Sequence, residues 1–181
     1  MQPIQRRALY ITILVAALAW IFLSADRAGT STAGEIPAPK EGFLAPDFSL
    51  RTPEGETVTL SELRGQAVLV NLWATWCPPC KAEMPTLQAY HNKYNGEGFS
   101  IIAINDGDPT PDVVQFAKDY NLTFPIWLDP TYIATEDAFK TLNLPSSFVI
   151  DRNGIIRWQW VGEINRKMLE KFVTPIIKEQ Q

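Results

Sequence analysis

The sequence predicts an α/β fold, in which a largely parallel but mixed sheet with an antiparallel edge is covered by helices on both faces. Two observations predict it. Segments with the β-branched and aromatic content of strands alternate with helical patterns through most of the 181 residues. An Asn153-Gly154 pair near the carboxyl end marks a hairpin, because Asn-Gly accepts positive φ. A third observation places the chemistry: the only two cysteines, Cys77 and Cys80, lie where a predicted strand passes into a helix.

The first half of the domain begins with two short predicted strands, residues 48–50 and 58–60, joined by a turn and followed by one helical turn. Residues 68–73 are rich in β-branched and aromatic side chains and predict a buried strand. From Pro78 the apolar residues recur at steps of three and four, which predicts a helix that ends at Asn95.

The second half continues the alternation. Strands are predicted at 99–105, 125–128, 147–151 and 155–160, and helices at 110–120, 133–142 and 165–178. Pro175 is expected to end or kink the last helix. Trp158 and Trp160 are two residues apart, so both rings are expected on one face of their strand.

The amino-terminal segment predicts export. Residues 8–23 are dominated by apolar side chains and follow Arg6-Arg7, which favours a signal-anchor within residues 1–25 over a cleaved signal peptide. Residues 26–41 read as a flexible linker, and residues 42–181 as the globular domain. With the arginines in the cytoplasm, the domain is expected on the extracytoplasmic side of the cell membrane, as a single-pass protein.

The two cysteines form a C-x-x-C pair, Cys77-Pro78-Pro79-Cys80. Residues three apart at a helix start lie about 5–6 Å from each other, close to the spacing that a disulfide prefers. The helix amino terminus favours a thiolate, which is the attacking species in disulfide exchange. We therefore expect Cys77 as the nucleophile and Cys80 as the resolving thiol.

Other uses of the pair are weaker. A structural zinc site needs four ligands, and the only further candidate, His91, is expected on the helix surface about three turns away. An inert disulfide across so short a loop would stabilise little. The net charge of −4, without a basic cluster, makes nucleic acid an unlikely partner.

Four stretches together resemble thioredoxin-fold proteins, and more narrowly the membrane-anchored, extracytoplasmic TlpA/ResA-like branch. The stretches are Ala45-Pro46-Asp47-Phe48, residues 68–80, Glu83-Met84-Pro85 and residues 144–151. This resemblance implies a thioredoxin fold with an amino-terminal β-hairpin extension and a central αβ insertion between residues 105 and 129. It also implies a thiol-disulfide oxidoreductase whose only redox group is the Cys77–Cys80 disulfide, with no other cofactor and no metal.

The resemblance also suggests roles for neighbouring residues. Thioredoxin has a buried acid where this chain has Asn71, and in the ResA-like branch a glutamate at the position of Glu83 influences the thiols. On a helix, Glu83 shares the face of Cys80, so a partly buried carboxylate could accept the proton of Cys80, whereas the alternative is a solvated surface glutamate.

Substrate-binding residues follow from the same comparison. Pro145 matches the family's cis-proline, which lets the preceding backbone, here that of Leu144, pair with an extended substrate. Trp76 is expected as an exposed ring beside the thiols, flanked by Pro78 and Pro79.

The expected activity is reduction of disulfides in client proteins. Pro78 and Pro79 provide neither a cation nor an amide hydrogen, which argues for a reducing couple. The resemblance suggests a membrane thiol-disulfide electron donor and a role in cytochrome c maturation, with the C-x-x-C-H segment of an apocytochrome c as client.

Four alternatives stay open. General disulfide exchange or repair and copper-site assembly would use the same dithiol. A copper or haem-ligand chaperone would use the two sulfurs as soft ligands. A thiol peroxidase would need Pro-x-x-x-Thr-x-x-Cys, but Val70 and Ala74 stand at those positions.

Overall fold

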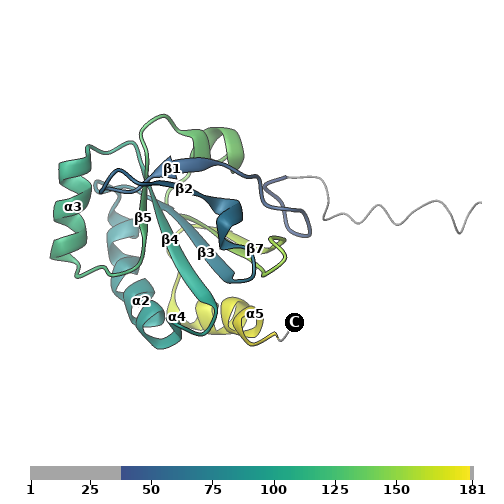
Figure 1. The fold of residues 1–181 in the computed structure, drawn as a ribbon. Coiled ribbons are helices and arrows are strands. Elements are labelled where there is room, and N and C mark those ends of the chain that lie inside the picture. Colours follow the sequence, from purple (N-terminus) through teal and green to yellow (C-terminus); the bar gives the residue numbers. More distant parts are fainter. Residues whose placement is uncertain (1–37, 180–181) are drawn as a thin grey trace, which may run out of the picture. The chain divides into compact units, whose positions relative to one another are not determined.

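The computed structural model describes residues 38–179. Their strands form one seven-stranded sheet in the order β2-β1-β5-β4-β3-β6-β7 (Figure 1). The strands are β1 (Ser49–Arg51), β2 (Thr57–Thr59), β3 (Ala67–Trp73), β4 (Phe99–Asp106), β5 (Ile126–Asp129), β6 (Ser146–Ile150) and β7 (Ile156–Val161). The helices are η1 (Leu60–Leu63), α2 (Pro78–Tyr94), α3 (Thr110–Asp119), η2 (Ile133–Ala138), α4 (Arg166–Met168), η3 (Leu169–Val173) and α5 (Thr174–Lys178).

The sheet is parallel only at its centre. The β3–β4 and β4–β5 pairs are parallel, whereas β1–β2, β1–β5, β3–β6 and β6–β7 are antiparallel. The α/β class and the mixed sheet are confirmed, but the expectation of a largely parallel sheet with one antiparallel edge is wrong. Alternation of strands and helices along the chain fixes β3-α2-β4-α3-β5 as parallel. It does not say that β6 returns to the far side of β3 and adds a second antiparallel edge.

Strand β3 is buried along its whole length and separates two apolar layers. Leu69 and Trp73 pack against α2, α3 and the carboxyl-terminal helices, and Figure 1 shows α2, α4 and α5 grouped on one side of the strands. Val68, Val70 and Leu72 face the other layer, which η1, η2 and the amino-terminal residues of the domain cover. This period-two division puts any polar side chain at position 71 on the α2 face.

The predicted central insertion contacts the active-site strand directly. Phe116 of α3 packs against the ring of Trp73, with ring centroids 4.6 Å apart. Trp73 is the last residue of β3, four positions before Cys77. The insertion therefore supports the end of the strand from which the cysteines follow.

Two predicted helices differ from the structure. The helix expected at 133–142 is a π-helical segment that ends at Ala138, because Lys140 adopts positive φ. The helix expected at 165–178 is divided into α4, η3 and α5. Pro175 lies in the first turn of α5, where its missing N–H is tolerated, and the π-helical η3 takes up the break in the hydrogen-bond ladder.

His91 is not on the helix surface as expected. Its side chain is 6% exposed and its ring meets the edge of Phe124, with centroids 5.9 Å apart. Burial lowers the pKa of this imidazole. The two tryptophans of β7 behave as predicted: the rings of Trp158 and Trp160 are stacked, with centroids 6.3 Å apart.

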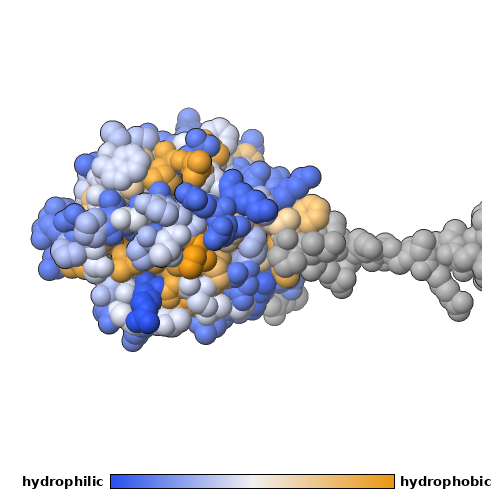
Figure 2. Space-filling model, turned by 90° about the horizontal axis from the view of Figure 1, so that it is seen from above, coloured by the Kyte–Doolittle hydropathy of each residue, from blue (hydrophilic) through white to orange (hydrophobic). Residues whose placement is uncertain are grey.

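The predicted anchor and most of the predicted linker lie outside the described residues. Residues 38–41 of that linker adjoin β7, where the Gln159 N–H donates to Glu41 Oε1 at 3.2 Å. Within residues 38–179 no helix is long and apolar enough to cross a membrane. The face of the domain seen in Figure 2 is mainly polar, with apolar patches between hydrophilic side chains.

Arg152, in the turn between β6 and β7, closes the carboxyl end of α5. Its guanidinium donates to the carbonyl oxygens of Ile176, Ile177 and Glu179 at 2.9–3.0 Å. These carbonyls have no partner within the helix, so a cation with several donors is well suited to them.

Arg152→Ala should lower the free energy of unfolding by about 2–3 kcal/mol, because several hydrogen bonds to a charged donor are lost. Arg152→Lys is the matched control and should lose less, since one ammonium keeps the charge but cannot reach all three carbonyls. Urea unfolding of the three proteins measures this. Equal loss for both variants would contradict the assignment of the effect to the charge at the helix end.

Candidate active site: the Cys77–Cys80 pair and the buried carboxyl behind it

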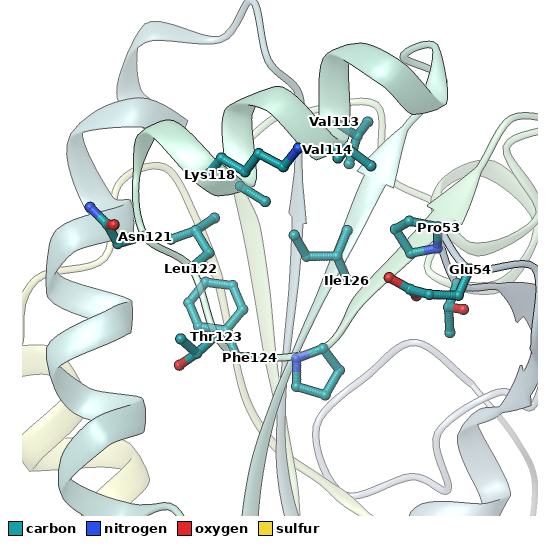
Figure 3. Close-up of a pocket in the computed structure, with 13 residues that line it drawn as sticks. Pro53, Glu54, Val113, Val114, Lys118, Asn121, Leu122, Thr123, Phe124 and Ile126 are labelled. Atoms are coloured by element: carbon teal, nitrogen blue, oxygen red, sulfur yellow. The ribbon is translucent and has the colours of Figure 1, made fainter.

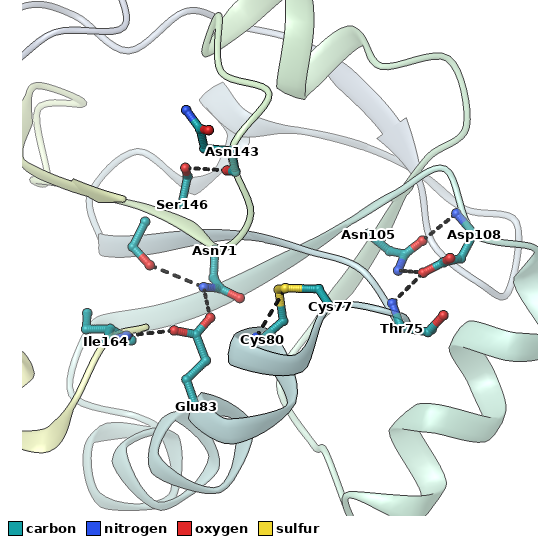
Figure 4. The surroundings of a disulfide bond; sticks show 11 residues. Asn71, Thr75, Cys77, Cys80, Glu83, Asn105, Asp108, Asn143, Ser146 and Ile164 are labelled. Carbon is teal, nitrogen blue, oxygen red and sulfur yellow. Dashed lines mark hydrogen bonds between the residues drawn. A yellow bond between two sulfur atoms is a disulfide. The ribbon is translucent and has the colours of Figure 1, made fainter. Parts of the chain in front are cut away.

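Cys77 lies at the point where β3 delivers the chain to α2. It is the N-cap of that helix, and its Sγ accepts a hydrogen bond from the Cys80 backbone N–H at 3.3 Å. The two cysteines form a disulfide with their Cα atoms 5.3 Å apart (Figure 4). Pro78 and Pro79 fill the first two helical positions and have no N–H. The Cys80 amide is therefore the first backbone donor of the helix that a Cys77 thiolate can use.

The surroundings of the disulfide distinguish its two sulfurs. Cys77 is 3% exposed and Cys80 is fully buried. Trp76 is 65% exposed, and Pro78 and Pro79 are also exposed. An approaching partner meets these three side chains first and then the edge of Cys77, which is the order expected for a nucleophile in front of a resolving thiol.

Glu83, one helical turn beyond Cys80, is fully buried. Its Oε1 accepts from Asn71 Nδ2 at 2.8 Å and its Oε2 accepts from the Ile164 backbone N–H at 2.8 Å. The alternative of a solvated surface glutamate is therefore wrong. No hydrogen bond joins Glu83 to either cysteine among the described residues, and in Figure 4 the Asn71 side chain lies between the carboxyl group and the disulfide.

Burial raises the pKa of Glu83 from its ordinary value of 4.5 to about 7. Removal of water from the carboxylate is the largest cause; the hydrogen bonds from Ile164 and Asn71 oppose it, and the charge of Glu163 adds to it. A carboxyl group that titrates near neutral pH can both accept and return a proton under ordinary conditions.

Pro145 immediately precedes β6, and Ser146 of β6 pairs with Leu72 of β3. The proline therefore lies at the same end of the sheet as the cysteines. The Leu144–Pro145 peptide bond is cis, as the resemblance implied, and Leu144 is half-buried beside it. Within residues 38–179 the Leu144 N–H and C=O make no hydrogen bond.

Sequence reasoning missed a second polar cluster next to the cysteines. Asp108 Oδ2 accepts from the Thr75 N–H at 2.6 Å and from Asn105 Nδ2 at 2.8 Å, and the Asp108 N–H donates to Asn105 Oδ1 at 3.0 Å. These bonds tie the turn before Cys77 to the end of β4. The sequence contains a signal for this cluster, because Asn105, Asp106 and Asp108 form a polar run at the carboxyl end of a buried strand, where ligand sites of α/β proteins gather.

A pocket of the domain lies elsewhere. It has a volume of about 770 Å³ and is formed by the turn between β1 and β2, by α3 and by the residues leading into β5 (Figure 3). None of the residues assigned to the cysteine site lines it.

Comparison with known proteins agrees with this site. Residues 42–159 match the AhpC/TSA family. The chain belongs to this family. It is 33% identical over 175 residues to the thiol-disulfide oxidoreductase ResA of Geobacillus kaustophilus, which covers 97% of each chain. The structure of StoA from Bacillus subtilis is similar with a TM-score of 0.60 and 28% identity, over 70% of this chain and 96% of that one. A thioredoxin-family thiol:disulfide interchange protein from Chlorobium tepidum has a TM-score of 0.64 and 26% identity, over 78% and 99%.

These likenesses confirm the thioredoxin fold and the ResA-like resemblance. The protein is a thiol-disulfide oxidoreductase with a C-x-x-C site, in which Cys77 and Cys80 are disulfide-bonded.

Glu83→Gln should change how stability depends on pH. The Glu83 carboxyl keeps its proton to higher pH in the folded protein than in the unfolded chain. Ionisation of Glu83 therefore does not reduce the free energy of unfolding of the parent below about pH 4.5, and it reduces it by the full amount above about pH 7. Relative to the parent, the free energy of unfolding of the variant should rise by about 2–3 kcal/mol between roughly pH 5 and pH 8. Urea unfolding of the oxidised protein measures the difference, with Glu163→Gln on the exposed neighbour as control. A pH-independent difference would show that Glu83 has an ordinary pKa.

Asp108→Ala should lower the free energy of unfolding by about 1–3 kcal/mol and slow the reaction of the reduced protein with a disulfide, because Thr75 and Asn105 lose their acceptor. Both donors contact the same oxygen, Asp108 Oδ2, so Asp108→Asn keeps an acceptor for Thr75 and Asn105 and loses only the negative charge; its loss should be smaller. Stopped-flow reduction of a small aromatic disulfide measures the rate. If the alanine variant reacts as fast as the parent, the cluster does not position Cys77.

Proposed function

We propose that the protein reduces disulfides in client proteins outside the cytoplasm, anchored by residues 8–23, with the C-x-x-C-H segment of an apocytochrome c as its client. The observation that carries the proposal is the arrangement of Cys77, which is 3% exposed and lies next to the exposed Trp76, in front of two fully buried groups, Cys80 and Glu83. A membrane thiol-disulfide donor would restore the dithiol after each cycle.

The reaction has two thiol-disulfide exchange steps, which together transfer two electrons to the client. The Cys77 thiolate attacks one sulfur of the client disulfide, and the other client sulfur leaves as a thiolate that takes a proton from water. Cys80 then loses its proton, attacks Cys77 Sγ and releases the second client sulfur. Two electrons pass to the client, its two sulfurs become thiols, and the enzyme gains the Cys77–Cys80 disulfide.

Glu83 is the acceptor for the proton of Cys80 in this proposal. Its pKa of about 7 makes the ionised carboxylate available near neutral pH, and the carboxylic acid can later return the proton. Client binding would use the exposed Trp76 and the backbone of Leu144 beside Pro145, which makes no hydrogen bond within residues 38–179.

The direction of electron flow is inferred from the small number of hydrogen-bond donors that stabilise the Cys77 thiolate. Pro78 and Pro79 remove two of the amide donors that a helix amino terminus offers, and one amide, that of Cys80, contacts the sulfur. A less stabilised thiolate makes the reduced form less stable and the couple more reducing.

A peroxidase is disfavoured by the same region. Val70 and Ala74 are fully buried and apolar, and Val70 belongs to the layer on the far side of the sheet from α2. Neither position can provide a hydroxyl that activates a peroxide. Copper-site assembly and general disulfide repair use the same dithiol and differ in the client.

Cys80→Ser should trap a mixed disulfide between Cys77 and the client, because the resolving thiol is missing. The trapped client is identified by peptide mapping from cells that express the full chain, and Cys77→Ser is the control that should trap nothing. Capture of an apocytochrome supports the proposal, whereas capture of a copper-site protein replaces it.

Titration of the parent against glutathione tests the direction. We expect the disulfide form to dominate until the glutathione buffer is strongly reducing. A strongly oxidising potential would reject the reductant function.

A further inference from the structure

Asn71 presents a buried polar atom that the fold does not satisfy. The side chain is fully buried on the α2 face of β3, and both N–H groups of its Nδ2 are used, at 2.8 Å to Glu83 Oε1 and at 3.2 Å to Ser147 Oγ. Its Oδ1 has no hydrogen-bond partner among residues 38–179. Figure 4 shows this oxygen directed toward the disulfide, while the nitrogen is directed toward Glu83.

Reduction of the disulfide creates a candidate partner for this oxygen. A disulfide sulfur has no hydrogen to donate, but once the bond is cleaved Cys80 carries an S–H in the same buried place. A carbonyl oxygen accepts from S–H and disfavours S⁻, whereas an amide N–H₂ does the reverse. The orientation of the Asn71 carboxamide therefore decides which form of Cys80 it supports.

That orientation depends on Glu83. An ionised carboxylate can only accept, so it requires the N–H₂ of Asn71 and leaves Oδ1 for Cys80. A protonated Glu83 can donate its O–H to Oδ1, which allows the carboxamide to turn over and offer N–H₂ to the sulfur. Ser147 permits both orientations, because a hydroxyl both donates and accepts.

We propose that Asn71 is a positioning residue that couples Glu83 to Cys80: its carboxamide holds Cys80 as a thiol while Glu83 is ionised and turns to support the thiolate once Glu83 is protonated. The proposal rests on the function proposed above and adds to it the residue that links the two buried groups. The proton that leaves Cys80 Sγ is balanced by the one taken up at Glu83, and the coupling is an equilibrium property, so no proton has to pass through the amide.

The coupling gives the resolving step an order. Cys80 stays protonated, and so unreactive, until its proton passes to Glu83, and this keeps the mixed disulfide intact long enough for the client to be engaged. Besides the cysteines and Glu83, the charged group that acts on this site is Glu163, which precedes Ile164 and raises the pKa of Glu83.

The test is a double-mutant cycle in the full chain with Cys77→Ser, so that Cys80 is the only thiol. The pKa of Cys80 is measured from the ultraviolet absorbance of its thiolate, with and without Glu83→Gln, and with and without Asn71→Leu. Glu83→Gln mimics the protonated carboxyl. It should increase the ionisation constant of Cys80 at least tenfold more when Asn71 is present than when it is replaced.

Loss of a nearby negative charge alone would raise the ionisation constant equally in both backgrounds, and that result overturns the proposal. Glu163→Gln is the control for loss of a nearby charge. Because Glu163 raises the pKa of Glu83, its removal favours the ionised carboxylate, so it should give no increase in the ionisation constant of Cys80 that depends on Asn71. If Asn71→Leu does not fold, Asn71→Ser repeats the cycle, since one hydroxyl cannot reach both neighbours.

The outcome is independent of client and direction of electron flow, because Cys77→Ser has no exchange activity to measure. Suppose that the redox titration gives a reducing potential and Cys80→Ser traps an apocytochrome, but the double-mutant cycle shows no excess that depends on Asn71. That combination rejects only the proposed role of Asn71. A positive cycle with an oxidising potential rejects the reductant function and leaves the coupling in place.

Discussion

The active site depends on the cost of keeping the Glu83 carboxyl away from water. No cation pairs with it among the described residues; two hydrogen bonds, from Asn71 and from the Ile164 backbone, offset part of that cost. These partners come from β3 and from the segment before α4, so one carboxyl joins the central strand, the active-site helix and the carboxyl-terminal helices. A group held in this way near its point of half-ionisation responds to small changes in its surroundings.

The second constraint is the placement of β3. Because both of its faces are buried and both of its edges are paired, its end is fixed in space, and Cys77 follows four residues later. Phe116 against Trp73 and Asp108 against Thr75 support that end from the insertion. The insertion therefore supports the segment that leads to Cys77 as well as extending the sheet.

The exposed and the buried residues of the site differ in chemistry. The exposed side chains beside the disulfide are uncharged: Trp76, Pro78 and Pro79. The two prolines also have no backbone N–H, so this surface offers contact area to a partner without a cation or a further amide donor for the thiolate. The polar groups, Asn71 and Glu83, lie behind the disulfide, where low solvent access strengthens each hydrogen bond. The surface that a partner would meet is therefore apolar, and the buried polar groups lie behind it.

The sequence by itself determined the α/β class, the positions of most strands, the cysteine pair at a helix start and the helical spacing that places Glu83 behind Cys80. These are local properties, set by periodicity and by the chemistry of neighbouring residues. Only the tertiary structure decided that the parallel part of the sheet is limited to β3, β4 and β5, that His91 is buried, and that Asn71 stands between Glu83 and the disulfide. Those facts depend on contacts between segments far apart in the chain, such as Glu83 with Ile164 and Asn71 with Ser147, which no local pattern encodes.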